Sequence, residues 1–435
     1  AALKRFKMLA QARGLKHVLI AATAALRDAG DAPEFIERVR REIGFDISPL
    51  SGTQEAYISA MGVLSGDRRS SGMAADLGGA SLELTQIQDG QVGTGKSFPL
   101  GPFSLFKTHF EPLHLRPEII SQLEGFPVSH GQKGQSLYLI GGAWRNLAMI
   151  HQKRVQYPLR VAQNYRLDIR EAQALARWAW SEDGQEELLM WRGLSRRRAE
   201  TLPYSGLLLD VLMDHLQPKD ITIAPGGLRD GMIYDALPES VKTAPALFDA
   251  CEVLVNNDAV GRDFGEALYS FLTAFDHAWP PAFERENEYR LRKAACLLVG
   301  IGKGMNPDHK AKMVFQTVLY APLPGVTHSE RAYLTLMLFA SFTEKLTTPN
   351  DVALQRLLSD EEQRSARLYG QAIRTAVKLS GRSYKTLNML ELECDAGCVK
   401  LKVKTGHEDL IDERCATYLA VFSDKLGREF YSAIG

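Results

Sequence analysis

The residues best suited to chemistry lie in the stretch DLGGASLEL, residues 76–84, where two acids flank a turn of small residues. The turn consists of Gly78, Gly79, Ala80 and Ser81. Its main-chain N–H groups can converge on an anion, and the hydroxyl of Ser81 can add a donor. Asp76 and Glu83 could hold Mg²⁺, which prefers carboxylate and phosphate oxygens. The stretch predicts a site for phosphate and magnesium, although such a hairpin can also be an ordinary tight turn.

A third acid, Glu55, stands in SGTQEAYISAMGVLSG, residues 51–66. Ser51 and Gln54 have the spacing of a capping box, which predicts a helix beginning at Ser51 with Glu55 in its first turns. A carboxylate near a helix N-terminus tends to stay ionised, and an ionised carboxylate can orient and deprotonate a water molecule. Glu55 is therefore a candidate general base. The alternative is a solvated residue of the helix cap.

A second phosphate motif is interpreted as a coincidence. Residues 90–97 fit the P-loop spacing G-x-x-x-x-G-K-[ST]. However, the motif begins in an Asp-Gly hairpin turn and is followed by FPLGPF, whose prolines and glycine oppose a helix. A P-loop needs the N-terminus of a helix to hold phosphate. We therefore expect a strand here and no nucleotide-binding loop.

The elements that must position these residues read as an α/β layer followed by helices. Helices are expected at 1–14, 31–44, 51–66 and, as an amphipathic helix, 205–216. Strands are expected at 17–22, 45–50, 73–76, 82–87, 92–100 and 136–142. Residues 220–237 read as a strand, a glycine turn and a helix. Long helical stretches fill 238–380, and two strands and a helix follow. We expect domains at 1–68, 69–237, 238–380 and 381–435.

Composition excludes several classes of protein. The chain has 435 residues, 45% of them hydrophobic, and its 52 basic residues balance 52 acidic ones. This is typical of a soluble globular protein with no overall field toward nucleic acid or membrane. Five cysteines without zinc-ligand spacing, and no apolar run long enough to span a bilayer, favour a cytoplasmic location.

Taken together, the motifs resemble the exopolyphosphatase/guanosine pentaphosphate phosphohydrolase (Ppx/GppA) family over nearly the whole chain. SGTQEAYISAMGVLSG is similar to the family's S-G-x-E-E-A helix start, and DLGGASLEL to its D-[IL]-G-G-G-S-x-E-L phosphate hairpin. PLGPFSLFKTHF looks like its L-G-x-x-x-L-x-x-x-F segment, and GGLRDGMIYDAL like its G-L-R-E-G-x-[LI]-Y-D helix start.

The resemblance implies an α/β fold of the actin-like kind, with duplicated RNase H-like domains that face a phosphate cleft. An all-α HD-like domain and a small α+β C-terminal domain would follow. It also implies Mg²⁺-dependent release of terminal orthophosphate from inorganic polyphosphate, from pppGpp, or from both, by a homodimer. The family's catalytic glutamate falls on Glu55. Arg145, Arg229 and the run Arg196, Arg197 and Arg198 are candidates for binding a polyanion, although the run could simply be a solvated helix end.

The sequence departs from the family pattern at several positions. Ala80 replaces the third glycine of the hairpin, which requires that this residue avoid a positive φ. Gln54 replaces an acid, and Asp230 stands where glutamate is usual. Val299 and Gly300 occupy the place of an His-Asp dyad, so we expect a metal-free, structural helical domain.

The family's first hairpin, D-x-G-S-N-[ST], is expected to precede Ala1, because the sequence begins within a helical pattern. Two other readings stay open. One is a sugar or acetate-type kinase of the same superfamily, although no sugar- or acid-binding loop is identifiable. The other is a catalytically impaired regulator that binds polyphosphate or (p)ppGpp.

Overall fold

The computed structural model describes residues 1–105, 110–124, 126, 134–256, 258–275, 281–394, 397–427 and 429–434. The segment matched to PLGPFSLFKTHF lies partly outside these residues. The chain forms two compact units, Ala1–Ala244 and Pro245–Gly435. The finer domain boundaries expected at 68, 237 and 380 stay predictions.

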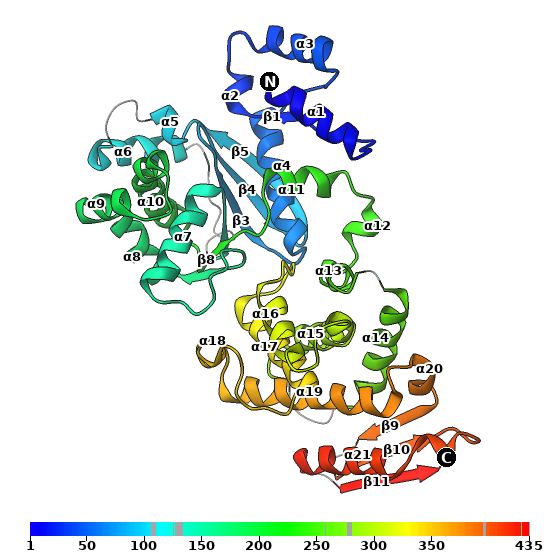
Figure 1. Cartoon of the computed structure of the whole chain (residues 1–435). Helices are drawn as coiled ribbons and strands as arrows, with labels where there is room; N and C mark the ends of the chain where they lie inside the picture. Colours follow the sequence, from blue (N-terminus) through cyan, green and yellow to red (C-terminus); the bar gives the residue numbers. More distant parts are fainter. Residues whose placement is uncertain are drawn as a thin grey trace. The chain divides into compact units, whose positions relative to one another are not determined.

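A six-stranded mixed sheet is the centre of the first unit (Figure 1). Its strands are β3 (Gly72–Leu77), β4 (Leu82–Gln88), β5 (Gln91–Phe98), β6 (Ser136–Ile140), β7 (Arg166–Asp168) and β8 (Asp220–Ile223), in the order β5-β4-β3-β6-β8-β7. The first three form an antiparallel meander, β6 and β8 run parallel to β3, and β7 is an antiparallel edge. A meander continued by parallel strands is expected of an RNase H-like domain, and the predicted actin-like α/β class is confirmed.

Helices cover both faces of this sheet (Figure 1). On one face lie α4 (Gly52–Gly66) and α11 (Leu228–Asp235), which enclose a small apolar core with β3 and β6. The other face carries α6 (Pro112–Leu123), α7 (Gly142–Arg154), α8 (Ile169–Trp180), α9 (Glu182–Met190) and α10 (Arg196–Leu216) over the larger core. The short helices α5 (Pro102–Leu105) and α12 (Glu239–Lys242) complete the connections.

Helix α10 corrects one expectation. An amphipathic helix was expected at 205–216, but α10 starts at Arg196, and every residue from Tyr204 to Met213 is buried. The reason is tertiary: α6, α7, α8 and α9 all pack around α10, so its central turns have no solvent-facing side.

Glycines allow α4 and α11 to cross in close contact. A methyl group on Gly231 would lie 1.8 Å from the carbonyl oxygen of Ile58, and one on Gly62 would lie 2.3 Å from that of Gly227. Real Cβ atoms are not found at such distances from a carbonyl oxygen, so both positions in this helix crossing require glycine. The crossing fixes the direction of α4 over the sheet.

The N-terminal segment consists of α1 (Ala2–Ala12), α2 (Ala24–Arg27) and α3 (Ala32–Ile43) around a small apolar cluster. Gly44 ends α3 in the left-handed conformation, as expected. The strands expected at 17–22 and 45–50 are shorter than predicted: β1 (Ala21–Ala22) and β2 (Ser48–Pro49) pair in parallel over two residues each.

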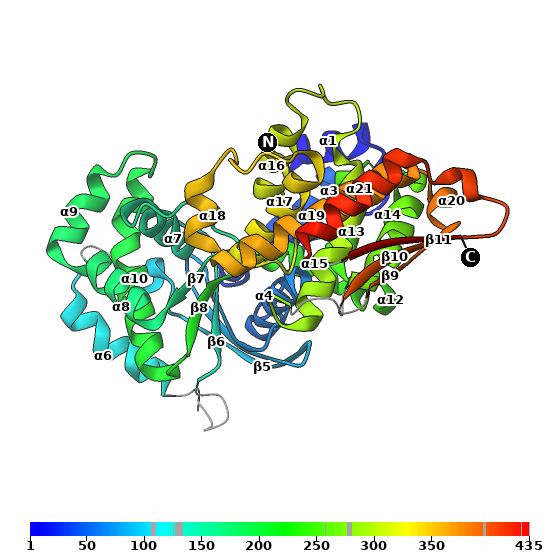
Figure 2. The same cartoon turned by 90° about the horizontal axis from the view of Figure 1, so that it is seen from below.

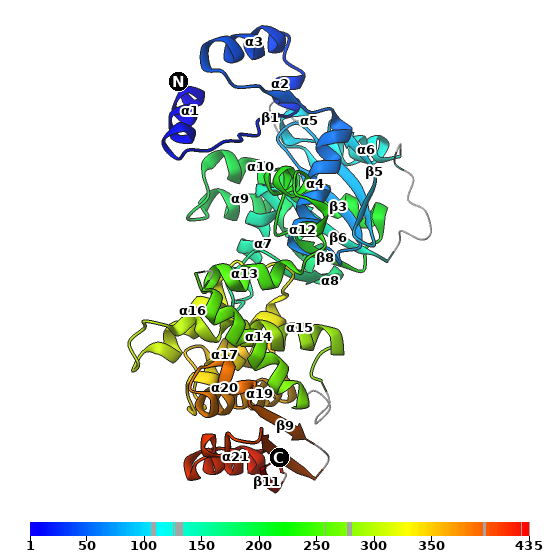
Figure 3. The same cartoon turned by 90° about the vertical axis from the view of Figure 1, so that its right-hand side faces the viewer.

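The second unit is mainly helical, with a small sheet at its end (Figures 2 and 3). Its helices are α13 (Ala246–Leu254), α14 (Ala259–Leu272), α15 (Arg285–Leu297), α16 (Lys310–Tyr320), α17 (His328–Phe342), α18 (Asp351–Leu357), α19 (Asp360–Ser380), α20 (Tyr384–Leu387) and α21 (Glu413–Lys425). The sheet contains the expected β9 (Leu390–Cys394) and β10 (Cys398–Val403), and also β11 (Glu429–Ile434), which was not predicted and pairs in parallel with β10.

Val299 and Gly300 lie in a single-turn 3₁₀ segment, Leu298–Gly302, of the second unit. In the described part of the chain, no three His, Cys, Asp or Glu side chains are grouped so that they alone could hold a metal ion. The helices that the structure describes also include none with the length and apolar character needed to cross a bilayer.

Candidate functional site

Glu55 is placed by the start of α4. Ser51 caps this helix: its hydroxyl accepts a bond from the Gln54 N–H at 3.2 Å, and its own N–H donates to the Gln54 side chain at 2.8 Å. The predicted capping box is confirmed. Glu55 is nevertheless only 7% exposed, so it is not a solvated cap residue.

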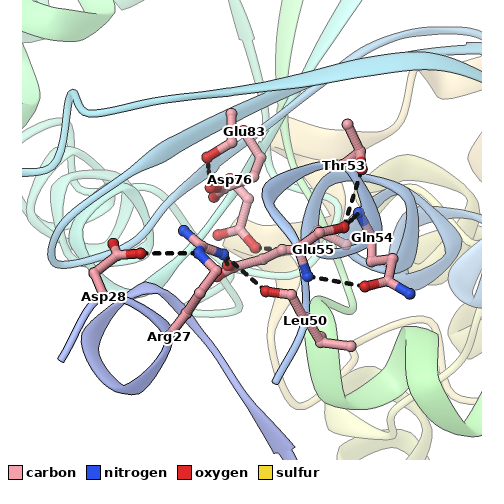
Figure 4. Close-up of polar contacts among 11 residues, drawn as sticks. Arg27, Asp28, Leu50, Thr53, Gln54, Glu55, Asp76 and Glu83 are labelled. Carbon is pink, nitrogen blue, oxygen red and sulfur yellow. Dashed lines mark hydrogen bonds and ion pairs between the residues drawn. The ribbon is translucent and has the colours of Figure 1, made fainter. Parts of the chain in front are cut away.

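Arg27 contacts Glu55 from the short helix α2 (Figure 4). Its Nη1 donates to Glu55 Oε2 at 3.2 Å and to the carbonyl oxygen of Leu50 at 2.9 Å, while its Nε donates to Asp28 at 3.1 Å. Burial raises the pKa of Glu55, and Arg27 opposes that rise by favouring the charged form. The expectation that the helix N-terminus alone keeps Glu55 ionised is therefore incomplete.

The path of α4 brings Glu55 over the strands that carry the other acids. A methyl group on Gly52 would lie 2.7 Å from the Cβ of Ser97 on β5. One turn later, the carbonyl oxygen of Ala56 accepts a bond from the hydroxyl of Thr85 on β4 at 3.0 Å. Ser59, four residues after Glu55 and on the same helix face, donates to Asp76 on β3 at 2.5 Å. The helix thus crosses β5, β4 and β3 in turn.

Asp76 and Glu83 face each other across the β3–β4 ladder (Figure 4). Glu83 is 2% exposed and accepts a bond from Ser97 at 2.7 Å. Burial raises the pKa of Asp76 against the stabilising bond from Ser59. Burial also raises the pKa of Glu83 to about 7, and the nearby charges of Glu55 and Asp76 add to the rise. We call Glu55, Asp76 and Glu83 the acidic cluster.

The turn at 78–81 has the main-chain groups that an anion site needs. Its ends close by a bond from the Gly78 N–H to the Ser81 carbonyl at 2.9 Å. In the part of the chain that the structure describes, the N–H groups of Gly79, Ala80 and Ser81 donate to no protein oxygen. Ala80 does not adopt a positive φ, so alanine is tolerated there. Among the described residues, three main-chain donors therefore remain available beside the acidic cluster.

Two of the predicted arginines have no recognised bond to the acidic cluster among the described residues. The side chains of Arg145, at the start of α7, and Arg229, at the start of α11, are both exposed. Among the described residues, no hydrogen bond or ion pair joins either to Glu55, Asp76 or Glu83. A phosphate-binding role for these two arginines stays a prediction.

Three functional neighbours were missed by sequence reasoning: Arg27, Ser59 and Ser97. Arg27 lies in a helix of only four residues, which no periodicity reveals. Ser59 had a detectable signal, since a polar residue four positions after the candidate base occupies the same helix face.

The donor set fits Mg²⁺. Two adjacent carboxylates whose pKa values are raised repel one another when both are ionised, and a cation would relieve that repulsion. Mg²⁺ needs only one or two protein carboxylates, with water and phosphate oxygens as its other ligands. Asp76 and Glu83 are the residues that would hold it.

A mixed sheet of this topology is that of the actin-like class, and a turn of small residues beside two carboxylates is suited to binding phosphate. The model of the Ppx/GppA phosphatase family matches residues 1–240, and that of the exopolyphosphatase C-terminal region matches residues 274–431. The chain belongs to the Ppx/GppA phosphatase family and is a phosphoanhydride hydrolase.

Two solved structures are similar to this chain at low sequence identity. An exopolyphosphatase from Cytophaga hutchinsonii is 20% identical, with a TM-score of 0.48; the match covers 55% of this chain and 81% of that one. The Ppx/GppA family member of Aquifex aeolicus is 22% identical, also with a TM-score of 0.48, over 56% of this chain and 80% of that one.

Proposed function

We propose that this protein releases the terminal orthophosphate of inorganic polyphosphate, with Glu55 as the general base. The observation that carries the proposal is a buried, arginine-paired glutamate over two strand carboxylates. These carboxylates flank a turn whose N–H groups at Gly79, Ala80 and Ser81 have no main-chain acceptor among the described residues.

The turn amides bind the non-bridging oxygens of the terminal phosphoryl group and stabilise the charge that spreads over them during transfer. The carboxylate of Glu55 orients a water molecule and accepts its proton as the water oxygen bonds to phosphorus. The anhydride P–O bond breaks, and the shortened polyphosphate leaves with the bonding electrons. Mg²⁺, held by Asp76 and Glu83, would neutralise phosphate charge when bound.

The electrostatics of Glu55 suit this role. A base works best when its pKa lies near the working pH, and burial moves the pKa of Glu55 upward from its ordinary value. Arg27 limits the rise in the pKa by favouring the ionised carboxylate, which is the form that accepts a proton. Arg27 acts through Glu55 and is a positioning residue.

The substrate is tested by phosphate release from long-chain polyphosphate and from pppGpp, each with Mg²⁺ and with EDTA. Both carry the same kind of terminal anhydride, so their ratio of kcat/KM measures preference directly. We expect Mg²⁺-dependent release from polyphosphate. Release from pppGpp alone would move the proposal to a pppGpp phosphohydrolase, and tight binding of either without turnover would favour a regulator.

A further inference from the structure

Phe103 is fixed to the tip of the phosphate turn. Its N–H donates to the Gly79 carbonyl at 2.9 Å, and its ring packs so closely that a methyl group on Gly79 would lie 3.0 Å from it. The neighbouring Ser104 hydroxyl donates to the Ala80 carbonyl at 2.7 Å, and the Gly101 N–H donates to the same oxygen at 3.1 Å. The turn and the start of α5 therefore form one hydrogen-bonded piece, yet the Phe103 residue is still 50% exposed.

Arg197 stacks on this ring. Its guanidinium carbon lies 4.5 Å from the centroid of Phe103, although the two residues come from α10 and α5. Arg197 is exposed, and in the described chain no ion pair is recorded for its side chain. Its neighbour Arg196, by contrast, pairs with Glu200 at 3.0 Å. The stacking holds the Arg197 guanidinium on the ring that contacts the turn, and among the described residues its N–H groups have no carboxylate partner.

The position of Arg197 is unfavourable for the helix itself. Arg196, Arg197 and Arg198 occupy the first turn of α10, where the helix dipole is positive and cations are destabilising. Residues that destabilise their own helix are expected mainly where a functional site requires them. Among the three arginines, Arg197 is the one directed by an aromatic ring against the phosphate turn, and this indicates a site for negative charge at Arg197.

We propose that Phe103 and Arg197 form a subsite for the phosphate units that follow the terminal one in the substrate chain. The ligand is the polyanionic part of the substrate that is not transferred: the guanidinium pairs with its phosphate oxygens, and the ring holds the guanidinium in place. This subsite rests on the proposed function, because its ligand is the substrate whose end the turn amides hold.

The test is direct binding of polyphosphate in EDTA, measured by titration calorimetry without turnover. Arg197→Ala is expected to raise Kd about tenfold, the loss typical of one charge-assisted hydrogen bond. It should also reduce the slope of log Kd against log salt concentration, which a purely structural role would not change. Phe103→Leu should lose part of the same affinity for polyphosphate. Phe103→Tyr, which keeps a ring, should bind polyphosphate as tightly as the wild-type protein.

Arg196→Ala is the matched control, because it removes an adjacent arginine that already has a carboxylate partner. An equal loss in Arg196→Ala and Arg197→Ala, or no loss in Arg197→Ala, would overturn the subsite, as would absence of polyphosphate binding by the wild-type protein. Phosphate release by wild-type protein with Mg²⁺ is scored separately. Arg197-dependent binding without release would contradict the proposed function and leave the subsite standing.

Discussion

Replacing Arg27 with glutamine should move the pH dependence of catalysis. The variant keeps a hydrogen-bonding side chain but loses the charge that opposes the burial of Glu55. At the 3.2 Å separation of the pair, Coulomb's law with an effective dielectric of ~20 gives about 5 kcal/mol. Arg27 is 25% exposed, so solvent screening reduces this figure. The pKa of Glu55 is therefore expected to rise further in the variant, because the opposite charge that favoured the ionised carboxylate is gone.

The assay is the pH profile of kcat for phosphate release. Because the ionised carboxylate is the active form, a higher pKa shifts the acidic limb of the profile to higher pH. Activity on the acidic limb should fall, by up to about tenfold for each pH unit that the limb moves, and recover at alkaline pH. Arg27→Lys, which keeps a positive charge, should leave the limb near its wild-type position. An unchanged limb in Arg27→Gln, or a shift to lower pH, would refute the coupling between Arg27 and the base.

Three further perturbations test other parts of the structure. The pKa of Glu83, about 7, lies above its ordinary 4.5, so the protonated side chain contributes stability below pH 4.5 that is lost as pH rises through 7. The unfolding free energy of the wild-type protein in EDTA should therefore fall by about 3 kcal/mol across this range. Glu83→Gln should abolish that fall. Gly231→Ala places a methyl group against the Ile58 carbonyl and should cost about 3 kcal/mol in denaturant unfolding, whereas Gly142→Ala, with open space around it, should cost almost nothing. Lys96→Ala should leave phosphate release unchanged, because Lys96 lies in strand β5 rather than in a P-loop; lost activity would reverse that assignment.

Local chemistry explains which elements the sequence predicted well. The capping box at Ser51 and the turn at Asp89–Gly90 both depend on neighbouring residues, and both are present. Asp89 and Gly90 each take the positive φ that a two-residue hairpin requires. The placement of Glu55 and of the Asp76–Glu83 pair followed from such local signals.

The remaining features depend on contacts between distant segments. Arg27 and Glu55 are 28 residues apart, and no local pattern indicates that they pair. The burial of α10 on all sides, and the stacking of Arg197 on Phe103, likewise arise only when separate elements pack together. Burial of Glu55 then reverses the direction of the pKa shift inferred from its helix position alone.

Single-turnover phosphate release from polyphosphate by Glu55→Gln measures the proposed chemistry most directly. Glu34→Gln is the matched control, since Glu34 is an exposed glutamate in the first turn of α3. Loss of the general base should lower the rate of Glu55→Gln by about 10²- to 10⁴-fold with polyphosphate binding retained, while Glu34→Gln stays at the wild-type rate. Release by Glu55→Gln at the wild-type rate would contradict the role of Glu55 as the base.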